Sequence, residues 1–389
     1  MIAKGRYMSK IELIATATFG LEAVVKREIE KLGYRITQSE NAKITYMTDE
    51  RGIARSNLRL RCADRVLLKM GEFTAETSED LFQQTKALPW EEWIPEDGKF
   101  TVQCTTVKSR LRSEPANQKT VKKAIVERMS ECYMRDIFPE TGAEYTVKIT
   151  LLRDRATLTI DTSGAGLHKR GYRQHPVAAP LKETLAAALV QLSFWKSGRL
   201  LIDPFCGSGT IPIEAAMYER NIAPGLGRTF ASENWDRIGS DIWKEERTAA
   251  YRDIDYGKNI KILGFDIDGG AVEAARANAE DAGVDDCIEI RQADFLTIEK
   301  MPEPYSVIIT NPPYGERIGD RKLLENINEH FAELIGGDET LSCYVITEDK
   351  NLEKTVMPRR PDRRRKLYNG RFETCYYQYY GERPPRTSE

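Results

Sequence analysis

The 389-residue sequence predicts an α/β protein whose C-terminal half forms a mostly parallel β-sheet, preceded by smaller α+β units. Two observations lead to this fold class. From about residue 181, helical and strand-like segments alternate strictly, which is typical of a parallel sheet covered by helices on both faces. Near the C-terminus, Leu367 and residues 372–380 flank Tyr368-Asn369-Gly370, and an Asn-Gly pair favours a β-hairpin. We therefore expect an antiparallel hairpin to close the sheet.

The composition is that of a globular protein, with 41% hydrophobic and 30% charged residues. Residues 1–10 are polar and basic without the apolar stretch of a signal peptide, and no run approaches the roughly 18 apolar residues of a membrane span. We expect a cytoplasmic protein with no membrane partner. The seven cysteines are dispersed and only three histidines occur, so we also expect no metal site.

The N-terminal part reads as two successive α+β units. The first contains an apolar strand at 11–16 and an amphipathic helix at 21–32. The second begins near Thr77, where polar residues can start a helix. It continues with a strand at 99–107, a helix at 118–132 and a hairpin of strands 145–152 and 156–161.

The C-terminal part supplies the alternating segments. The expected strands are 200–203, 261–265, 288–292, 306–310 and 343–347, and the expected helices are 181–195, 211 onward, 270–282 and 322–335. The gap between Gly209 and Asp266 is far longer than the usual spacing of about 20 residues, and residues 223–258 within it look like an inserted loop.

The motif DPFCGSGT, residues 203–210, lies between an expected strand and an expected helix. Gly207 and Gly209 allow a tight turn that lets the backbone approach a ligand at the carboxyl end of the strand. Thr210 stands where a P-loop requires Lys, and Pro212 occupies the third glycine position of the dinucleotide fingerprint, so neither motif fits. Two glycines on their own would also fit an ordinary strand-to-helix turn.

Acidic residues follow the next two strands. Asp266 is placed to accept hydrogen bonds from both hydroxyls of a ribose, and Asp294 from the exocyclic amine of an adenine. Asp268 fits a helix N-cap equally well. Glycines and two aspartates at three successive strand ends describe an adenosine site.

The run NPPYGER, residues 311–317, follows the fourth strand. Two prolines fix the backbone and remove its donors, so that carbonyl oxygens are left as acceptors. The Asn311 side-chain oxygen and the Pro312 carbonyl can accept the two N–H groups of an exocyclic amine, while Tyr314 stacks on the ring. Such holding orients the amine for in-line attack on a methyl sulfonium without a protein nucleophile. Cys206 could suggest a covalent nucleophile, but its place in the glycine loop favours packing.

These motifs together resemble the class I S-adenosylmethionine-dependent methyltransferases that modify exocyclic amines of bases. The segments SGAGLHKRGYR (163–173) and APLKETLA (179–186), together with the α+β N-terminal half, resemble the THUMP-domain ribosomal RNA guanine-N2 methyltransferases along essentially the whole chain. The resemblance implies a ferredoxin-like subdomain at 1–75, a THUMP RNA-binding domain at 76–165 and a Rossmann-like methyltransferase domain at 166–389. The last of these would have a seven-stranded, mostly parallel sheet.

The resemblance also assigns roles to residues. The residues expected to hold S-adenosylmethionine are Asp203, Pro204, Phe205, Gly207, Gly209, Thr210, Asp266, Ile267, Asp294, Phe295 and Asn311. The residues expected at the reacting amine are Asn311, Pro312, Pro313 and Tyr314. Asp203 also suits a role in ordering the loop.

Two basic clusters and one basic pair are expected to contact RNA phosphates. They comprise Lys108, Arg110, Arg112, Lys119, Lys122 and Lys123, then Lys169 and Arg170, and finally Arg363, Arg364 and Arg365 before the terminal hairpin. A solvated surface is the competing interpretation of such runs. The net charge of −2 argues against nucleic acid coating the whole surface, so binding would be local.

The function that the sequence favours is methyl transfer to guanine N2 in RNA, most simply large-subunit ribosomal RNA. The sequence leaves open the same chemistry on transfer RNA, adenine-N6 methylation of DNA and a non-enzymatic role in ribosome assembly. It does not identify the modified guanine or the oligomeric state.

Overall fold

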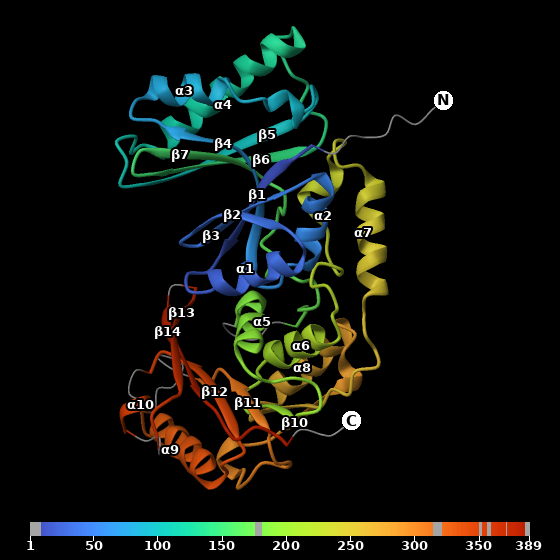
Figure 1. The fold of residues 1–389 in the computed structure, drawn as a ribbon, viewed down its shortest axis with the longest axis vertical. Coiled ribbons are helices and arrows are strands. Elements are labelled where there is room, and N and C mark those ends of the chain that lie inside the picture. Colours follow the sequence, from blue (N-terminus) through green and yellow to red (C-terminus); the bar gives the residue numbers. More distant parts are fainter. Residues whose placement is uncertain are drawn as a thin grey trace. The chain divides into compact units, whose positions relative to one another are not determined.

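The computed structural model describes residues 9–175, 181–313, 321–349, 352–355, 359–370 and 372–385. The chain divides into two compact units (Figure 1). Unit 1 comprises residues 1–17, 26–167 and 229–249, and unit 2 comprises residues 18–25, 168–228 and 250–389. Within the described ranges, no helix has the length and apolar character needed to cross a bilayer.

Unit 1 is built on one seven-stranded sheet with the order β2-β3-β1-β4-β7-β6-β5. Its strands are β1 (Ile11–Ala17), β2 (Arg35–Glu40), β3 (Lys43–Thr48), β4 (Ala63–Thr74), β5 (Lys99–Val107), β6 (Glu144–Leu152) and β7 (Arg155–Asp161). The helices in this part of the chain are α1 (Glu22–Lys31), α2 (Glu50–Arg59), α3 (Ser78–Lys86) and α4 (Glu114–Tyr133). The short 3₁₀ turn η1 spans Trp90–Glu92.

A single long strand joins the two α+β segments that the sequence suggested. β4 has 12 residues, pairs with β1 through its first half and pairs with β7 through its second half. The register shifts between Lys69 and Gly71, and a Cβ atom at Gly71 would lie 2.6 Å from the Leu88 side chain. The two segments therefore share one continuous sheet, which their separate sequence patterns did not indicate.

Local signals set several element ends as expected. Thr77 and Asp80 form a reciprocal capping box at the start of α3. Arg153 and Asp154 both adopt positive φ angles in the two-residue turn between β6 and β7, as a type I′ hairpin turn requires. Helix α4 begins four residues earlier than expected, because Ser113 caps it and Pro115 fits its first turn.

The expectation that residues 223–258 form an inserted loop is wrong. They contain the 3₁₀ turn η2 (Ala231–Asn234) and helix α7 (Ser240–Arg252), and residues 229–249 belong to unit 1. Trp235 is 1% exposed and stacks on Tyr145 of β6 with ring centroids 4.8 Å apart. The segment therefore contains regular elements, and one of its side chains packs against a residue about 90 positions earlier in the chain.

Ion pairs also tie α7 to α2 inside unit 1. The Glu246 carboxylate, 2% exposed, accepts hydrogen bonds from Arg55 at 2.8 and 2.9 Å and from Arg51 at 3.0 Å. These arginines hold the pKa of Glu246 below its usual range although burial acts in the opposite direction. A buried carboxylate with several charge-assisted bonds is costly to leave unpaired.

Unit 2 is built on a second seven-stranded sheet with the order β10-β9-β8-β11-β12-β14-β13. Its strands are β8 (Leu201–Asp203), β9 (Ile262–Asp266), β10 (Ile288–Gln292), β11 (Val307–Thr310), β12 (Ser342–Thr347), β13 (Arg363–Asn369) and β14 (Phe372–Tyr379). Its helices are α5 (Glu183–Leu192), α6 (Thr210–Glu219), α8 (Gly269–Asp281), α9 (Arg321–Gly337) and α10 (Leu352–Thr355). The 3₁₀ turns η3 and η4 span Asp285–Cys287 and Phe295–Thr297.

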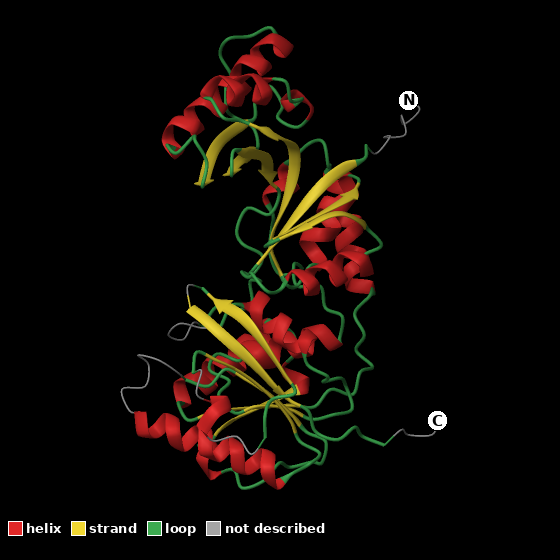
Figure 2. Ribbon diagram, turned by 60° about the vertical axis from the view of Figure 1, so that its left-hand side comes forward, coloured by secondary structure: helices red, strands yellow, loops and turns green. Residues whose placement is uncertain are grey.

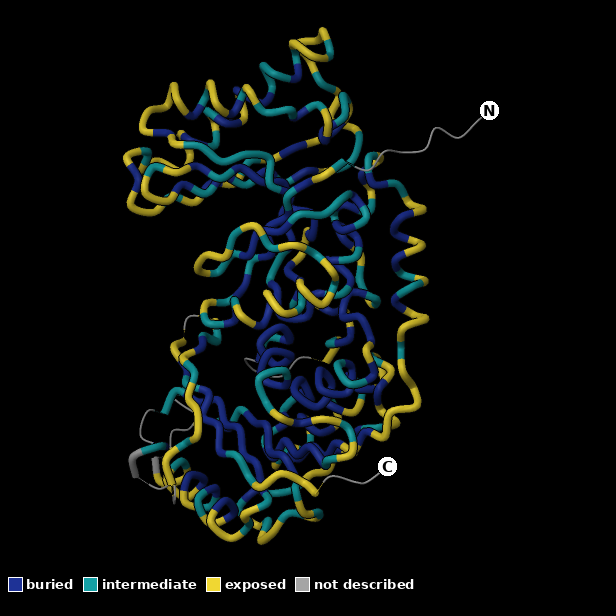
Figure 3. Tube along the Cα trace, viewed as in Figure 1, coloured by how far each residue is buried: buried dark blue, intermediate teal, exposed yellow. Residues whose placement is uncertain are grey.

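The second sheet confirms the predicted fold class. Strands β8 to β12 run parallel, whereas β14 pairs antiparallel with both β12 and β13. Helices α5, α6 and α8 cover one face and α9 covers the other (Figure 2). The central strands β8, β11 and β12 are buried throughout (Figure 3).

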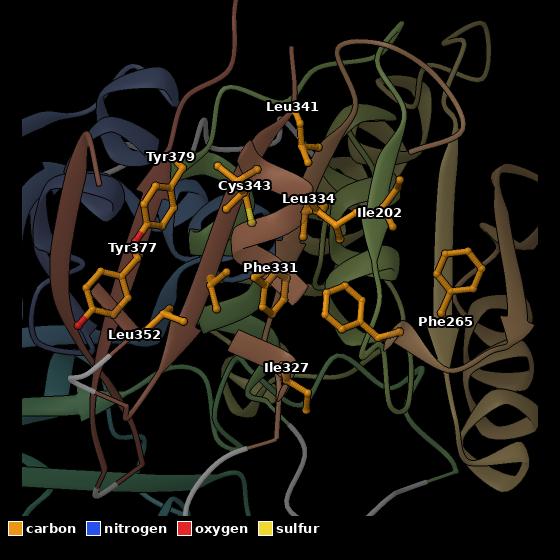
Figure 4. Packing of buried hydrophobic residues seen from close by; sticks show 14 of the residues in the cluster. Ile202, Phe265, Ile327, Phe331, Leu334, Leu341, Cys343, Leu352, Tyr377 and Tyr379 are labelled. Atoms are coloured by element: carbon orange, nitrogen blue, oxygen red, sulfur yellow. The ribbon is translucent and has the colours of Figure 1, made fainter. Parts of the chain in front are cut away.

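One large apolar cluster lies between α9 and the second sheet and extends along the strands to their carboxyl ends. Phe331 of α9 lies among Ile202, Phe265 and Cys343 from the sheet (Figure 4). Fully buried aromatic side chains of this kind supply much of the hydrophobic stabilisation of a domain. The cluster gives the strand ends a rigid base.

The basic run at 363–366 lies elsewhere than expected. It forms the first part of β13, the edge strand of the sheet, rather than a segment before the hairpin. All four residues are exposed or partly exposed, and an edge strand accommodates such charged side chains without loss of pairing.

Candidate active site at the carboxyl ends of the parallel strands

A cavity of about 530 Å³ opens at the carboxyl ends of β8 to β11. The order of the sheet reverses at β8, whose neighbours are β9 and β11, and ligands of open α/β sheets bind at such a point. The cavity is lined by Leu181, Asp203, Pro204, Phe205, Cys206, Gly207, Ser208, Thr210, Ile211, Asp266, Ile267, Asp268, Ala293, Asp294, Phe295, Leu296, Asn311, Pro313, Leu323 and Ile327. The lining includes every residue predicted to hold the cofactor except Gly209.

The glycine loop takes the shape that its sequence suggested. Gly207 and Gly209 have φ angles of +52° and +82°, and Gly209 is the N-cap of α6. A Cβ atom at Gly209 would lie 3.2 Å from the Cβ of Ala275, so this glycine lets α6 and α8 approach closely. Gly209 therefore shapes the loop from behind, while Gly207 forms the wall of the cavity.

Asp266 anchors the loop and keeps capacity for a ligand. Its two carboxylate oxygens accept hydrogen bonds from the backbone N–H groups of Gly207 at 2.9 Å and Asp268 at 3.0 Å. An ionised carboxylate has about four acceptor positions, so two remain for the hydroxyls of a ribose.

Asp268 and Asp294 act as local caps. Asp268 accepts from the N–H of Gly270 at the start of α8, and Asp294 accepts from the N–H of Leu296 at the start of η4. Phe295, which follows Asp294, packs against Phe205 with ring centroids 4.9 Å apart. The capping interpretation of Asp268 is thus confirmed, and the second oxygen of Asp294 remains for a base amine.

Asp203 lies beneath the loop. It is 1% exposed, and its carboxylate accepts a hydrogen bond from the Thr310 hydroxyl at 2.7 Å. Burial raises the pKa of Asp203 to about 7, with the Asp266 charge adding to this effect in a minor way. The hydrogen bond joins the end of β8 to the end of β11, immediately before Asn311.

The Asn311 side chain leaves an acceptor unused. Its oxygen Oδ1 is buried and has no hydrogen-bond partner among the residues the structure describes. Buried polar atoms are nearly always paired, so an unpaired one at a cavity wall marks a ligand position. Pro312 is buried and Pro313 lines the cavity, while Tyr314 lies outside the described residues.

A buried polar clamp next to the loop was not predicted. Arg173 donates to the backbone oxygen of Leu181 at 2.8 Å and to the Thr210 hydroxyl at 2.9 Å, and both acceptors belong to residues that line the cavity. Asn278 of α8 exchanges hydrogen bonds with the backbone of His175 and donates to the Ser208 oxygen. Arg173 is the last residue of the segment 163–173 that carries the family resemblance. No nearby residue in the sequence indicated its partner Thr210, which lies 37 residues further along the chain.

Three family models match the chain. The RMKL-like methyltransferase domain matches residues 170–378, the RlmL ferredoxin-like domain 12–67 and the THUMP domain 75–161. The Bacillus subtilis (strain 168) protein "Putative RNA methyltransferase YpsC" is 46% identical over 382 residues, which cover 97% of this chain and 98% of that one. The chain belongs to the RMKL-like methyltransferase family.

Solved structures of relatives agree with the architecture of this methyltransferase. A "possible methylase" from Clostridium difficile 630 is 43% identical with a TM-score of 0.93, covering 97% of this chain and all of its own. A "predicted N6-adenine-specific DNA methylase" from Listeria monocytogenes str. 4b F2365 is 45% identical with a TM-score of 0.91, covering 96% and 97%. SMU.472, described as "a putative methyltransferase complexed with SAH" (S-adenosylhomocysteine), is 41% identical with a TM-score of 0.91, covering 97% and 99%.

The cavity of the methyltransferase fits S-adenosylmethionine. Four aspartates line the cavity, and its described lining contains no Lys or Arg. The cavity therefore favours a positively charged nucleoside without phosphates. Its volume lies within the usual range for small-molecule sites. Asp266 would hold the ribose and Asp294 the adenine amine, and bound S-adenosylmethionine supplies an activated methyl group.

Cys206 does not serve as a nucleophile in this arrangement. Its side chain is buried in the loop, and burial raises the pKa of the thiol well above its usual value. A thiol held in its neutral form is a poor nucleophile. The packing interpretation of Cys206 therefore fits the structure.

The prediction that Arg170 contacts RNA is wrong. Its side chain is 2% exposed, and its Nε lies 3.2 Å from the Glu214 carboxylate, which is fully buried. The Tyr172 hydroxyl donates to the same carboxylate. A sequence run of basic residues does not reveal which member points inward to a buried partner, whereas the adjacent Lys169 is exposed.

The other residues predicted to contact RNA lie at the surface. Lys108, Arg110, Arg112, Lys119, Lys122, Lys123, Arg363 and Arg364 are exposed, and Arg365 is partly exposed. Arg110 pairs with Glu76, while the ammonium groups of Lys122 and Lys123 lie 5.6 and 5.5 Å from the ring centroids of Phe100 and Phe82. The α4 face therefore presents cations in ordered positions.

Proposed function

We propose that this methyltransferase transfers the methyl group of S-adenosylmethionine to the exocyclic N2 amine of a guanine in RNA, with large-subunit ribosomal RNA as substrate. The observation that carries the proposal is the buried Oδ1 of Asn311 beside the cofactor cavity, which no other described residue pairs with. An acceptor that must be satisfied by a ligand suits an amine donor, because leaving it unpaired costs about 1–3 kcal/mol.

The chain positions the amine rather than activating it. Asn311 Oδ1 and the Pro312 carbonyl accept its two N–H groups, so that the nitrogen lone pair points at the methyl carbon. Tyr314, which lies outside the described residues, would stack on the base. Positioning of this kind contributes to rate through proximity and orientation, without a covalent intermediate on the protein.

RNA is favoured over DNA by the N-terminal unit. A THUMP domain matches residues 75–161, and the exposed cations of α4 lie within this match. The YpsC relative is named as an RNA methyltransferase, which agrees with this assignment. A guanine inside a helix has to leave its stack to reach Asn311, at a cost of a few kcal/mol.

A second candidate is adenine-N6 methylation of DNA, because the Listeria relative carries that name and an Asn-Pro-Pro run can hold any exocyclic amine. Transfer RNA is the alternative substrate for guanine-N2 chemistry. A non-enzymatic assembly role would leave every nucleic acid unlabelled.

The test offers methyl-labelled S-adenosylmethionine together with ribosomal RNA, transfer RNA or DNA from cells that lack this protein. We expect label in ribosomal RNA, released on digestion as N2-methylguanosine. Label in N6-methyladenine would contradict the guanine assignment, and label in transfer RNA alone would contradict the ribosomal one.

A further inference from the structure

The exposed ring of Phe19 packs on the partly exposed ring of Tyr368, a residue of the edge strand β13. The rings of Phe19 and Tyr368 meet edge to face with centroids 5.9 Å apart, and 47% of Phe19 is exposed. Gly20 makes this approach possible, because its φ is +92° and a Cβ atom there would lie 2.7 Å from the backbone oxygen of Lys366. The backbone thus holds two aromatic rings at the surface of the unit.

The strand register places this pair at the same end of the sheet as the cavity, namely the end where the parallel strands have their carboxyl termini. β12 runs parallel to β11, and its last residue, Thr347, pairs with Cys375 of β14. Cys375 also pairs with Lys366, two residues before Tyr368. Asn311 follows β11 at this end of the sheet. Strands β12 and β14 lie between β11 and β13, so three strand spacings, roughly 15 Å in total, separate β11 from β13.

Two cations, each paired with a carboxylate, lie on the same strand as Tyr368. The Lys366 ammonium lies 5.5 Å from the ring centroid of Tyr368, and Arg364 is exposed on the same strand. Both cations face carboxylates, Lys366 with Glu373 at 2.6 Å and Arg364 with Glu353 at 2.9 Å. Surface ion pairs of this kind are weak, so a phosphate can replace the carboxylate as partner.

We propose that Phe19 and Tyr368 form a stacking platform for unpaired RNA nucleotides next to the target base, with Lys366 and Arg364 contacting their phosphates. The inference rests on the proposed function. When a target base leaves its stack, its neighbours lose a stacking partner. Aromatic side chains within a basic groove accept the faces of any base, which restores stacking without reading sequence.

A second aromatic pair in unit 2, formed by the exposed Phe194 and the partly exposed Tyr380, provides a matched control. Phe194 and Tyr380 lie with ring centroids 4.9 Å apart, and 61% of Phe194 is exposed. Tyr380 follows Tyr379, which pairs with Cys343 near the start of β12. This pair therefore lies at the opposite end of the sheet, where the parallel strands begin. Stacking at Phe194 is therefore not expected to help RNA that enters the cavity.

The experiment measures binding of a short fluorescein-labelled oligoadenylate RNA to the full chain saturated with S-adenosylhomocysteine. Stacking contributes about 1–3 kcal/mol per base, so Phe19→Leu with Tyr368→Leu should weaken binding by roughly 5- to 150-fold. Phe194→Leu with Tyr380→Leu should bind as the parent does. An abasic oligomer should bind the parent and the platform variant equally, because only base stacking is removed.

Equal losses in the two double variants would overturn the platform, and so would a parent that binds the abasic oligomer as tightly as oligoadenylate. If the platform variant loses cofactor affinity, Tyr368→Leu on its own replaces it in the same comparison. A platform variant that binds and methylates RNA like the parent contradicts this inference only. A parent that needs the platform for oligoadenylate but methylates adenine in DNA contradicts only the proposed function.

Discussion

Two asparagines in the two units show opposite uses of a buried amide. Asn57 of α2 in unit 1 is 1% exposed, donates to the Ile53 oxygen at 2.9 Å and to the Thr162 hydroxyl at 2.8 Å, and accepts from the Ser163 hydroxyl at 2.6 Å. Asn311 in unit 2 has a buried oxygen with no partner in the described part of the chain.

The difference separates stability from catalysis. A satisfied network rigidifies the fold, and deleting one member leaves the others unpaired. An unsatisfied acceptor contributes nothing to the folded state, and a fold keeps such a group where a ligand will pair with it. The following predictions test this separation, beginning with the largest effect.

The largest effect is expected for Asn311→Ala. Losing the acceptor misaligns the amine, so turnover should fall by at least about a hundredfold. The affinity for S-adenosylhomocysteine and the free energy of unfolding should change little, because within the described ranges no group donates to the Asn311 side-chain oxygen. Single-turnover methyl transfer, calorimetric titration and denaturant unfolding measure the three quantities, and Asn311→Asp should retain part of the rate because it keeps an acceptor.

Asn57→Ala is the matched substitution in unit 1. It leaves the Ser163 and Thr162 hydroxyls without their amide partner, so the free energy of unfolding should drop by about 1–3 kcal/mol. Turnover per folded molecule should stay at the parental value. A large loss of turnover in a fully folded Asn57→Ala protein would break the comparison.

Asp203 sharpens the comparison because it is buried, hydrogen-bonded and able to titrate. Its folded-state pKa of about 7 lies above the usual value near 4, so the folded protein binds a proton that the unfolded chain has lost. Stability from this group should therefore be fully present below about pH 4 and should fall as the pH rises to about 7. The thermal unfolding temperature should fall less steeply between pH 5 and pH 8 in Asp203→Asn than in the parent. Parallel curves of unfolding temperature against pH for the two proteins would contradict the raised pKa of Asp203.

The smallest effect is expected at the α4 face. Replacing Lys119, Lys122 and Lys123 by Glu should flatten the salt dependence of RNA binding by about 0.7–0.9 log units per lost phosphate contact. Cofactor affinity should not change, since these residues lie in unit 1 and the cavity lies in unit 2. A parental salt slope would mean that this face is only solvated.

The sequence carried the local part of this architecture. The Asn-Pro-Pro run, the glycine loop and the Thr77 cap depend on residues close together in the chain, and the structure placed Asn311, Gly207 and Asp266 around one cavity as expected. The alternation of helical and strand-like segments also indicated every parallel strand of the second sheet.

Contacts between residues far apart in the chain could not be predicted from the sequence. Asn57 meets partners 105 and 106 residues away, and the Trp235 ring packs on Tyr145 from a segment that looked like a loop. Arg170 shows the same limit, because a charge pattern does not reveal a partner such as Glu214 that is 44 residues further along. Such contacts depend on how elements pack together, which no local period records.

The most direct test of the account is a cycle that combines Asn311→Ala with removal of the amine from the base. One RNA fragment carries the unmodified target guanosine at its centre, and the other carries inosine there, which lacks the N2 amine. Binding of both fragments to the parent and to Asn311→Ala is measured in the presence of S-adenosylhomocysteine. We predict that the parent prefers guanosine by about 1 kcal/mol and that this preference disappears in Asn311→Ala. An equal preference in both proteins would show that Asn311 does not hold the amine.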